Sequence, residues 1–382
     1  MKSKTSHFLP TDLLGLSRLA VGATAGVTDL VESLHGTIVR AAGPLGFFSP
    51  HRAGGITNLV YRGIRGVTRL TGGTLEVALR GIVPLLGEAG SSPQRENLLA
   101  ILNGVLGDQL EAQRNPLAIP MSFRLAGRPL QLEKTALAAA FPQATGKILV
   151  LAHGLCRNDL QWKQPDREGE GPIADLARER GYTVVPLHYN SGRHISRNGR
   201  ELSSLLEKLI GAWPEPVSEL AIVAHSMGGL VTRSACLEAE KSGDLAWRRL
   251  LRKIVFLGTP HHGAPLERGG NLFETMLGWN TFTEPFTRLA EIRSAGITDL
   301  RYGNLHGEDG QGGDRFERGP DSRRPSPLPA GVDCFAVAGT IGGIARSGVT
   351  CSILPPSTLT SSVPGALNPI APSPGANHAS TR

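Results

Sequence analysis

Compact apolar runs alternate with amphipathic stretches between residues 119 and 343. Runs of five or six mainly apolar residues predict strands buried on both faces, at 148–152, 183–188, 220–224 and 253–257. Helical periodicity separates these runs, for example at 173–180 and 199–210. Strands and helices that alternate at this spacing predict an α/β fold with a mostly parallel, doubly wound sheet. Such a sheet binds its ligands at the carboxyl ends of the strands.

Two further patterns extend this core. Residues 121–132 alternate between apolar and polar around a turn that contains glycine, and they predict an antiparallel hairpin at the start of the sheet. Residues 332–339 predict another strand. The long connection at 264–330 predicts either a cap over the site or a surface excursion.

Residues 1–118 carry a helical pattern of their own. Apolar residues at steps of three and four predict helices at 11–40, 56–86 and 97–110. Arg62, Arg65 and Arg69 follow one side of the middle stretch. Such a face fits peripheral contact with an anionic membrane surface, or a solvated helix side packed onto the core. We expect a helical accessory segment and not a second enzyme.

The composition changes abruptly beyond residue 343. Residues 344–382 contain no Asp or Glu and six prolines. This Pro/Ser-rich composition predicts a disordered tail that does not supply a further strand and helix. The tail is either a divergent end of the gene or the product of a frame slip, and the coding sequence read in all frames near codon 343 distinguishes the two.

Charge and cysteine content exclude several classes of protein. The formal net charge is +7, from 40 Lys plus Arg and 33 Asp plus Glu, and aromatic residues make up 5%. This mild excess lacks the basic and aromatic interleaving of a nucleic-acid binder, so we predict no nucleic-acid partner. The four cysteines are scattered without a Cys-x-x-Cys pair, which predicts neither a metal site nor a disulfide framework, and no cofactor is indicated.

We expect no targeting segment at the N-terminus. Pro10 and Asp12 interrupt any apolar run after the two initial lysines, so we predict no signal peptide. The sequence has no run of 18 apolar residues that predicts a membrane span. The expected location is cytoplasmic, with peripheral contact to the membrane as the alternative.

The strongest chemical signal lies where the apolar run at 220–224 meets a helical pattern. The run 220–223 stops at Ala224-His-Ser-Met-Gly228, and a helical pattern starts at Gly229. A sharp strand–helix turn around x-Ser-x-Gly is a nucleophile elbow, which exposes the serine Oγ above the edge of the sheet. Ser226 is the candidate nucleophile. The alternative is a serine that only caps a helix.

A second loop favours the catalytic interpretation. The strand at 148–152 runs into His153-Gly154-Leu155. Gly154 lets the backbone turn, so that the N–H of Leu155 can point at the same place as the N–H of Met227. These two N–H groups are the candidate oxyanion-hole donors.

Three motifs occur in the order of a known family. They are His153-Gly-Leu155, Ala224-His-Ser-Met-Gly-Gly229 and Leu257-Gly-Thr-Pro-His-His-Gly263. The set resembles bacterial α/β-hydrolases of the lipase and esterase type, near the group that includes GPI inositol-deacylase-like lipases. The resemblance covers residues 119–343. It implies the α/β-hydrolase fold and hydrolysis of an ester or lipid-like substrate by Ser226, with Leu155 and Met227 in the oxyanion hole.

The general base and the acid are harder to place. His261 and His262 come too early for the usual Ser…Asp…His order, which favours a structural or pocket-lining role. Glu267 and Asp299 are acids in principle, but neither directly follows a strand. His378 has the right chain order for the base, on a segment that little holds in place. A non-catalytic relative that binds an acyl ligand or a partner is therefore the alternative to a serine esterase.

Overall fold

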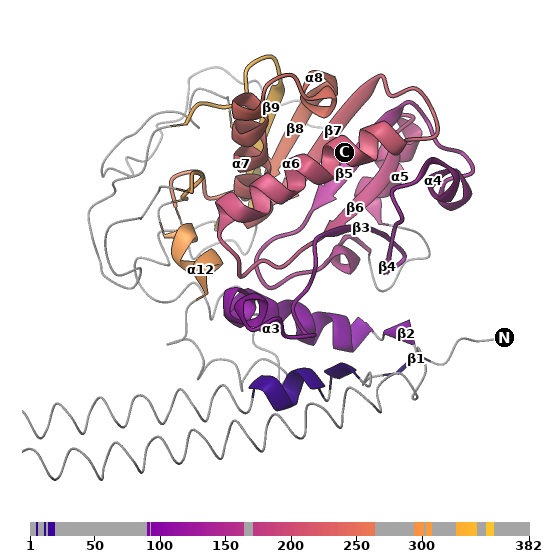
Figure 1. The fold of residues 1–382 in the computed structure, drawn as a ribbon. Helices are drawn as coiled ribbons and strands as arrows, with labels where there is room; N and C mark the ends of the chain where they lie inside the picture. The colour runs from indigo at the N-terminus through magenta and orange to yellow at the C-terminus, as the bar shows by residue number, and fades with distance from the viewer. Residues whose placement is uncertain are drawn as a thin grey trace, which may run out of the picture.

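An eight-stranded sheet runs through the computed structural model, in the order β10-β9-β8-β7-β5-β6-β3-β4 (Figure 1). The structure describes residues 5–6, 11–12, 14–19, 90–91, 93–163, 171–263, 294–301, 303–307, 326–341 and 349–354. The strands of the sheet are β3 (Ser122–Leu125), β4 (Arg128–Pro129), β5 (Lys147–Ala152), β6 (Thr183–His188), β7 (Glu219–His225), β8 (Leu251–Leu257), β9 (Asp333–Ile341) and β10 (Val349–Leu354). The helices are α3 (Pro93–Ala112), α4 (Lys134–Ala140), η3 (Asp159–Trp162), α5 (Pro172–Glu179), α6 (Ile195–Ala212), α7 (Met227–Ser242), α8 (Ala246–Leu250) and α12 (Ala295–Leu300). A separate parallel pair joins β1 (Thr5–Ser6) to β2 (Gly90–Ser91).

The centre of the sheet is parallel. β6, β5, β7, β8 and β9 pair in parallel, while β3 and β10 join the two sides in antiparallel fashion. This is the α/β-hydrolase fold, and it confirms the fold class predicted from the alternating pattern. The β3–β4 hairpin closes through Ala126 and Gly127, both with positive φ (50° and 79°), as a two-residue turn requires.

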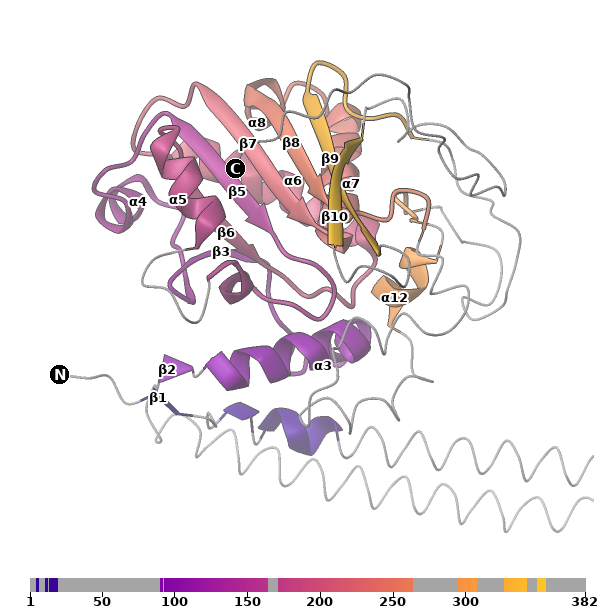
Figure 2. The ribbon, with the colours of Figure 1, turned by 180° about the vertical axis from the view of Figure 1, so that it is seen from behind.

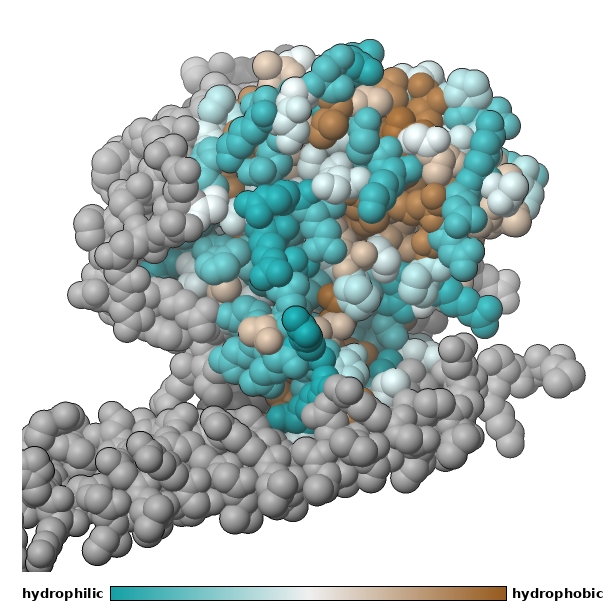
Figure 3. Space-filling view, viewed as in Figure 1, coloured by the Kyte–Doolittle hydropathy of each residue, from teal (hydrophilic) through white to brown (hydrophobic). Residues whose placement is uncertain are grey.

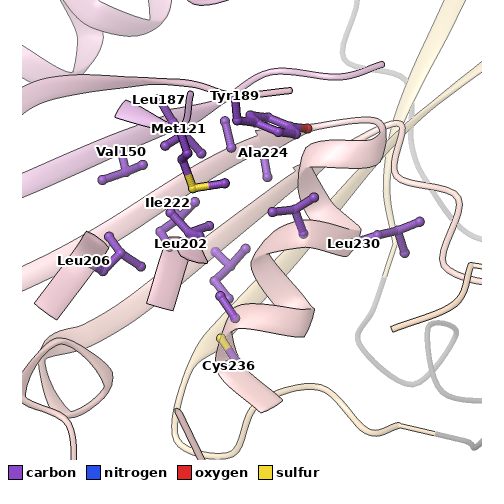
Figure 4. Close-up of a cluster of buried hydrophobic side chains, with 14 of the residues drawn as sticks. Met121, Val150, Leu187, Tyr189, Leu202, Leu206, Ile222, Ala224, Leu230 and Cys236 are labelled. Carbon is purple, nitrogen blue, oxygen red and sulfur yellow. The ribbon is translucent and has the colours of Figure 1, made fainter. Parts of the chain in front are cut away.

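Helices cover both faces of this sheet. α6 and α7 lie on one face, and α5 lies on the other (Figures 1 and 2). The main core fills the space between the sheet and α6 and α7, and Figure 4 shows part of it. Its buried side chains include Val150, Leu187, Leu202, Leu206, Ile222 and Leu230. A Leu or Ile buried in this way contributes about 1.5–3 kcal/mol relative to an exposed one.

The outer side of α6 and α7 is mostly hydrophilic (Figure 3). Arg197 and Arg200 stand on α6 with 59% and 64% of their side chains exposed. Apolar residues of the same helix, such as Leu202 and Leu206, are fully buried. This division explains the amphipathic pattern of the sequence.

The predicted N-terminal helices are described in part. The pattern at 97–110 belongs to α3, residues 11–12 and 14–19 are helical, and the stretch 56–86 lies outside the described residues. α3 runs along the carboxyl edge of the sheet, on the side to which the parallel strands point (Figure 2). None of the described helices is long and apolar enough to cross a membrane.

One strand differs from the expectation for the tail. Residues 349–354 form β10, antiparallel to β9 with Val349 opposite Ile341 and Leu354 opposite Ala336, although no strand was predicted beyond residue 343. Apolar or β-branched residues make up most of this segment of the sequence, and the backbone of β10 pairs with the otherwise open edge of β9. The rest of the tail and most of the 264–330 connection lie outside the described residues.

Candidate active site

Ser226 lies at the turn between β7 and α7, where the elbow was predicted. Its backbone has φ 52° and ψ −123°, a conformation that residues other than glycine rarely adopt. Its N–H donates to the carbonyl oxygen of Leu257 at 2.8 Å, which joins the turn to the end of β8. A capping serine has extended backbone angles and a side chain bonded to the helix, and Ser226 has neither. The geometry therefore favours the elbow over the cap.

Two glycines bring the elbow and the first loop into contact. A Cβ on Gly228 would lie 2.5 Å from the carbonyl oxygen of His153, and one on Gly154 would lie 3.0 Å from Cβ of Ser226. Neither position has room for a side chain. The loops that carry Leu155 and Met227 are thus pressed together beside Ser226. Met227 is the first residue of α7, so its N–H has no acceptor within the helix.

His153 holds the first loop in shape. Its Nε2 accepts a hydrogen bond from the N–H of Tyr189 at 3.2 Å, which leaves Nδ1 to donate to the carbonyl oxygen of Gly154 at 2.9 Å. The hydroxyl of Tyr189 donates to the His153 carbonyl at 2.8 Å, and the two rings stack at 4.3 Å. Complete burial lowers the pKa of His153 to about 3, so the ring is neutral at physiological pH. These contacts suit a structural part of an oxyanion loop.

His261 is held against α7. Its Nδ1 lies 3.0 Å from a guanidinium nitrogen of Arg233, and its ring meets Phe256 edge-on at 4.7 Å. Burial first, and then the charge of Arg233, lower the pKa of His261 to about 3. A histidine with so low a pKa is a weak base at neutral pH. The contacts fit the structural role that its position in the chain favours.

Asp299 is bound at the start of α6. Its carboxylate accepts from the N–H of Ile195 at 2.9 Å and lies 3.1 Å from Nδ1 of His194. Asn304 donates to its other oxygen at 3.4 Å. These contacts stabilise a helix terminus, where a negative charge is favourable. Glu267 and His378, the other candidates for acid and base, lie outside the described residues.

A buried charged cluster beside the site was not predicted. A guanidinium nitrogen of Arg124 lies 2.8 Å from Glu96 and 3.0 Å from Asp159, and Asp159 also contacts His188 at 3.2 Å. Burial raises the pKa of Glu96, but the hydrogen bond and charge of Arg124 outweigh it and lower the pKa. For Asp159, His188 and Arg124 together outweigh burial in the same way. The cluster joins α3, β3, η3 and β6, and the ring of His188 lies 5.9 Å from that of His153.

The polar residues that follow β6 were also missed. Tyr189 fixes His153, and the hydroxyl of Ser191 accepts from the N–H of Cys156 at 3.1 Å. The signal was present, because residues 189–191 form a polar run directly after a buried strand. Loops in this position meet the other loops at the carboxyl edge.

The described residues hold no metal cluster, and a cavity among them lies away from Ser226. No group of three or more His, Cys, Asp or Glu side chains among them is arranged to hold a metal ion. A hollow of about 260 Å³ lies near the amino ends of β7 and β8, lined by Lys134, Ile210, Trp213, Pro214, Glu215, Pro216, Val217 and Leu250. It is at the opposite edge of the sheet from Ser226 and does not belong to the candidate site.

One family model matches part of this chain, and several solved structures are distantly similar to it. Residues 126–296 match a family model described as a domain of unknown function, DUF7379. No curated protein matches the sequence. The similar solved structures include a mature lipase from Bacillus licheniformis, at 21% identity and a TM-score of 0.30, over 40% of this chain and 54% of the lipase.

Two further structures are similar at the same distant level. An esterase from Pyrococcus furiosus matches at 15% identity and a TM-score of 0.28, over 41% of this chain and 57% of the esterase. The phospholipase PlaB from Legionella pneumophila matches at 16% identity and a TM-score of 0.24, over 41% of this chain and 33% of PlaB. The chain thus spans less than two thirds of the length of each of these proteins.

Proposed function

We propose that this chain is a serine hydrolase for carboxylic esters, with Ser226 as nucleophile and Leu155 and Met227 as oxyanion donors. The observation that carries the proposal is the backbone of Ser226, held at φ 52° in a strand–helix turn without a capping bond. Backbone strain of this kind costs about 1–3 kcal/mol and is typical of functional sites. The sequence resemblance to bacterial lipases near the GPI inositol-deacylase-like group points to the same chemistry.

The proposed reaction has two steps. Oγ of Ser226 attacks the ester carbonyl, a base removes its proton, and the N–H groups of Leu155 and Met227 donate to the oxyanion. The alcohol leaves with that proton. Water then hydrolyses the acyl-enzyme and restores the serine. Chain order assigns the base to His378, although its Pro/Ser-rich surroundings offer little to hold it, so we expect slow turnover.

The substrate we propose is an ester or lipid-like small molecule.

Two contacts give the described N-terminal helical segment a structural role. Asn115, just after α3, donates to the carbonyl of Gly15 at 3.0 Å, and Arg95 pairs with Asp12. Peripheral membrane contact in the cytoplasm through the N-terminal helices remains part of the proposal. Co-sedimentation with anionic and neutral vesicles tests it, and equal absence from both pellets would contradict it.

Covalent labelling tests the proposed nucleophile. A fluorophosphonate reacts with an activated serine, and mass spectrometry locates the adduct. We expect the adduct on Ser226, none in Ser226→Ala, and an unchanged adduct in Ser204→Ala, which alters an exposed serine on α6. Undiminished labelling of Ser226→Ala would refute the assignment. A protein that binds an acyl ligand without any labelling would support the non-catalytic alternative.

A further inference from the structure

α3 packs directly on the loops that follow β5 and β6. A Cβ on Gly104 would lie 2.3 Å from Sγ of Cys156 and 3.0 Å from its backbone nitrogen. A Cβ on Gly107 would overlap the side chain of Asn190, which donates to the Gly107 carbonyl at 2.9 Å. The backbone of α3 therefore approaches these loops as closely as only glycine permits.

The loop residue under this helix has an unfavourable backbone conformation. Cys156 directly follows Leu155 and has φ 55°. The left-handed conformation is unfavourable for a residue other than glycine, so neighbouring contacts must hold it. One is the hydrogen bond from its N–H to Ser191, and the other is the packing of Sγ against α3, 4.0 Å from the carbonyl oxygen of Ile101.

The thiol of Cys156 contributes packing and not chemical reactivity. Cys156 is 7% exposed, and burial raises the pKa of its thiol to about 12. It is therefore a neutral group at physiological pH and a poor nucleophile. On the other side of Leu155, Gly154 lies so near the elbow that a Cβ on it would be 3.0 Å from Cβ of Ser226. Leu155 is thus held between the elbow and α3.

We propose that Gly104 and Cys156 are positioning residues of the oxyanion hole, through which α3 fixes the direction of the Leu155 N–H. The inference rests on the proposed function of Ser226. It makes α3 part of the active-site architecture, although this helix lies outside the region of family resemblance. An oxyanion donor requires placement within a few tenths of an ångström, and a shift of about 1 Å costs on the order of 100-fold in rate.

A size exchange between the two positions tests this proposal. Gly104→Ala places a methyl group where Sγ lies, and Cys156→Ala leaves a void there. In the double variant, the new methyl group occupies the space that Sγ has left, and its close approach to the backbone nitrogen of residue 156, at 3.0 Å, remains. We expect each single variant to lower the rate constant of fluorophosphonate inactivation of Ser226, kinact, by about 10- to 100-fold for Gly104→Ala and by less for Cys156→Ala. KI should change little, and the double variant should recover part of the rate that Gly104→Ala loses.

The matched control is Gly211→Ala on α6, where a Cβ meets nothing within 4 Å. It should leave kinact and KI unchanged. A second readout is independent of the serine: iodoacetamide should modify Cys156 in native Gly104→Ala faster than in the wild type. If Gly104→Ala does not fold, Cys156→Ala and the double variant carry the same comparison.

The outcomes separate the two proposals. Folded single variants with wild-type kinact, or a double variant without recovery, would overturn the positioning role. If wild-type Ser226 does not react with the probe, the proposed function fails. The oxyanion role then fails with it, and the protection of Cys156 tests only whether α3 holds this loop: faster modification in Gly104→Ala supports that contact, and unchanged protection overturns it.

Discussion

Replacing the candidate nucleophile by glycine should stabilise the protein relative to replacing it by alanine. Alanine keeps the Cβ of Ser226 and therefore the unfavourable backbone at φ 52° and ψ −123°. Glycine adopts these angles without strain, which is worth about 1–3 kcal/mol. The greater freedom of glycine in the unfolded chain offsets about 0.4–1 kcal/mol of this. We therefore expect Ser226→Gly to be more stable than Ser226→Ala by about 1–2 kcal/mol.

Urea denaturation of the two variants measures this difference, provided that both have the same m-value. Ser204 supplies the control, because it lies exposed on α6 with ordinary helical angles. There the order should reverse, with glycine less stable than alanine by about 1 kcal/mol. A Ser226→Gly protein no more stable than Ser226→Ala would refute the claim that the elbow stores backbone strain.

Three further predictions follow from the buried polar groups and the missing base. Arg124→Ala should lower the free energy of unfolding, measured by chemical denaturation, by about 3–5 kcal/mol because it leaves buried carboxylates unpaired. Arg178→Ala, whose partner is exposed, should lower it by no more than about 1 kcal/mol. Equal effects of the two variants would contradict this. His153 and His261 have pKa values near 3 when folded and about 6.5 when unfolded. The unfolded state therefore binds more protons below pH 6.5, and each residue should lower the free energy of unfolding by about 2 kcal/mol at pH 5. His261→Gln should weaken this dependence of stability on pH, and an unchanged dependence would count against burial of a neutral ring. The rate of p-nitrophenyl ester hydrolysis should exceed that of the uncatalysed reaction in water by no more than about 10³–10⁴-fold. Lipase-like turnover that His378→Ala abolishes would show this expectation to be wrong.

The elbow was predictable because its demands are local. Ser226 needs small neighbours within two residues, and Gly154 stands at the end of its own strand, so both are visible in a short stretch of sequence. The alternating apolar runs predicted the parallel sheet for the same reason. Each signal lies within the element that it specifies.

The supporting contacts were not predictable because they join distant parts of the chain. Gly104 meets Cys156 across 52 positions, and Arg124 pairs with Glu96 and Asp159 on elements that no local pattern connects. A helical glycine in α3 resembles any other weak helix former until its neighbour is known. β10 was missed because an edge strand depends on the partner that it pairs with as well as on its own sequence.

The structure of a phosphonate adduct tests the central claim most directly. A crystal structure of the chain after reaction with a fluorophosphonate should show phosphorus bonded to Oγ of Ser226. One phosphoryl oxygen should lie about 2.7–3.1 Å from the backbone nitrogens of both Leu155 and Met227. Phosphorus on any other residue, or an oxygen that faces away from these two nitrogens, would contradict the proposed active site.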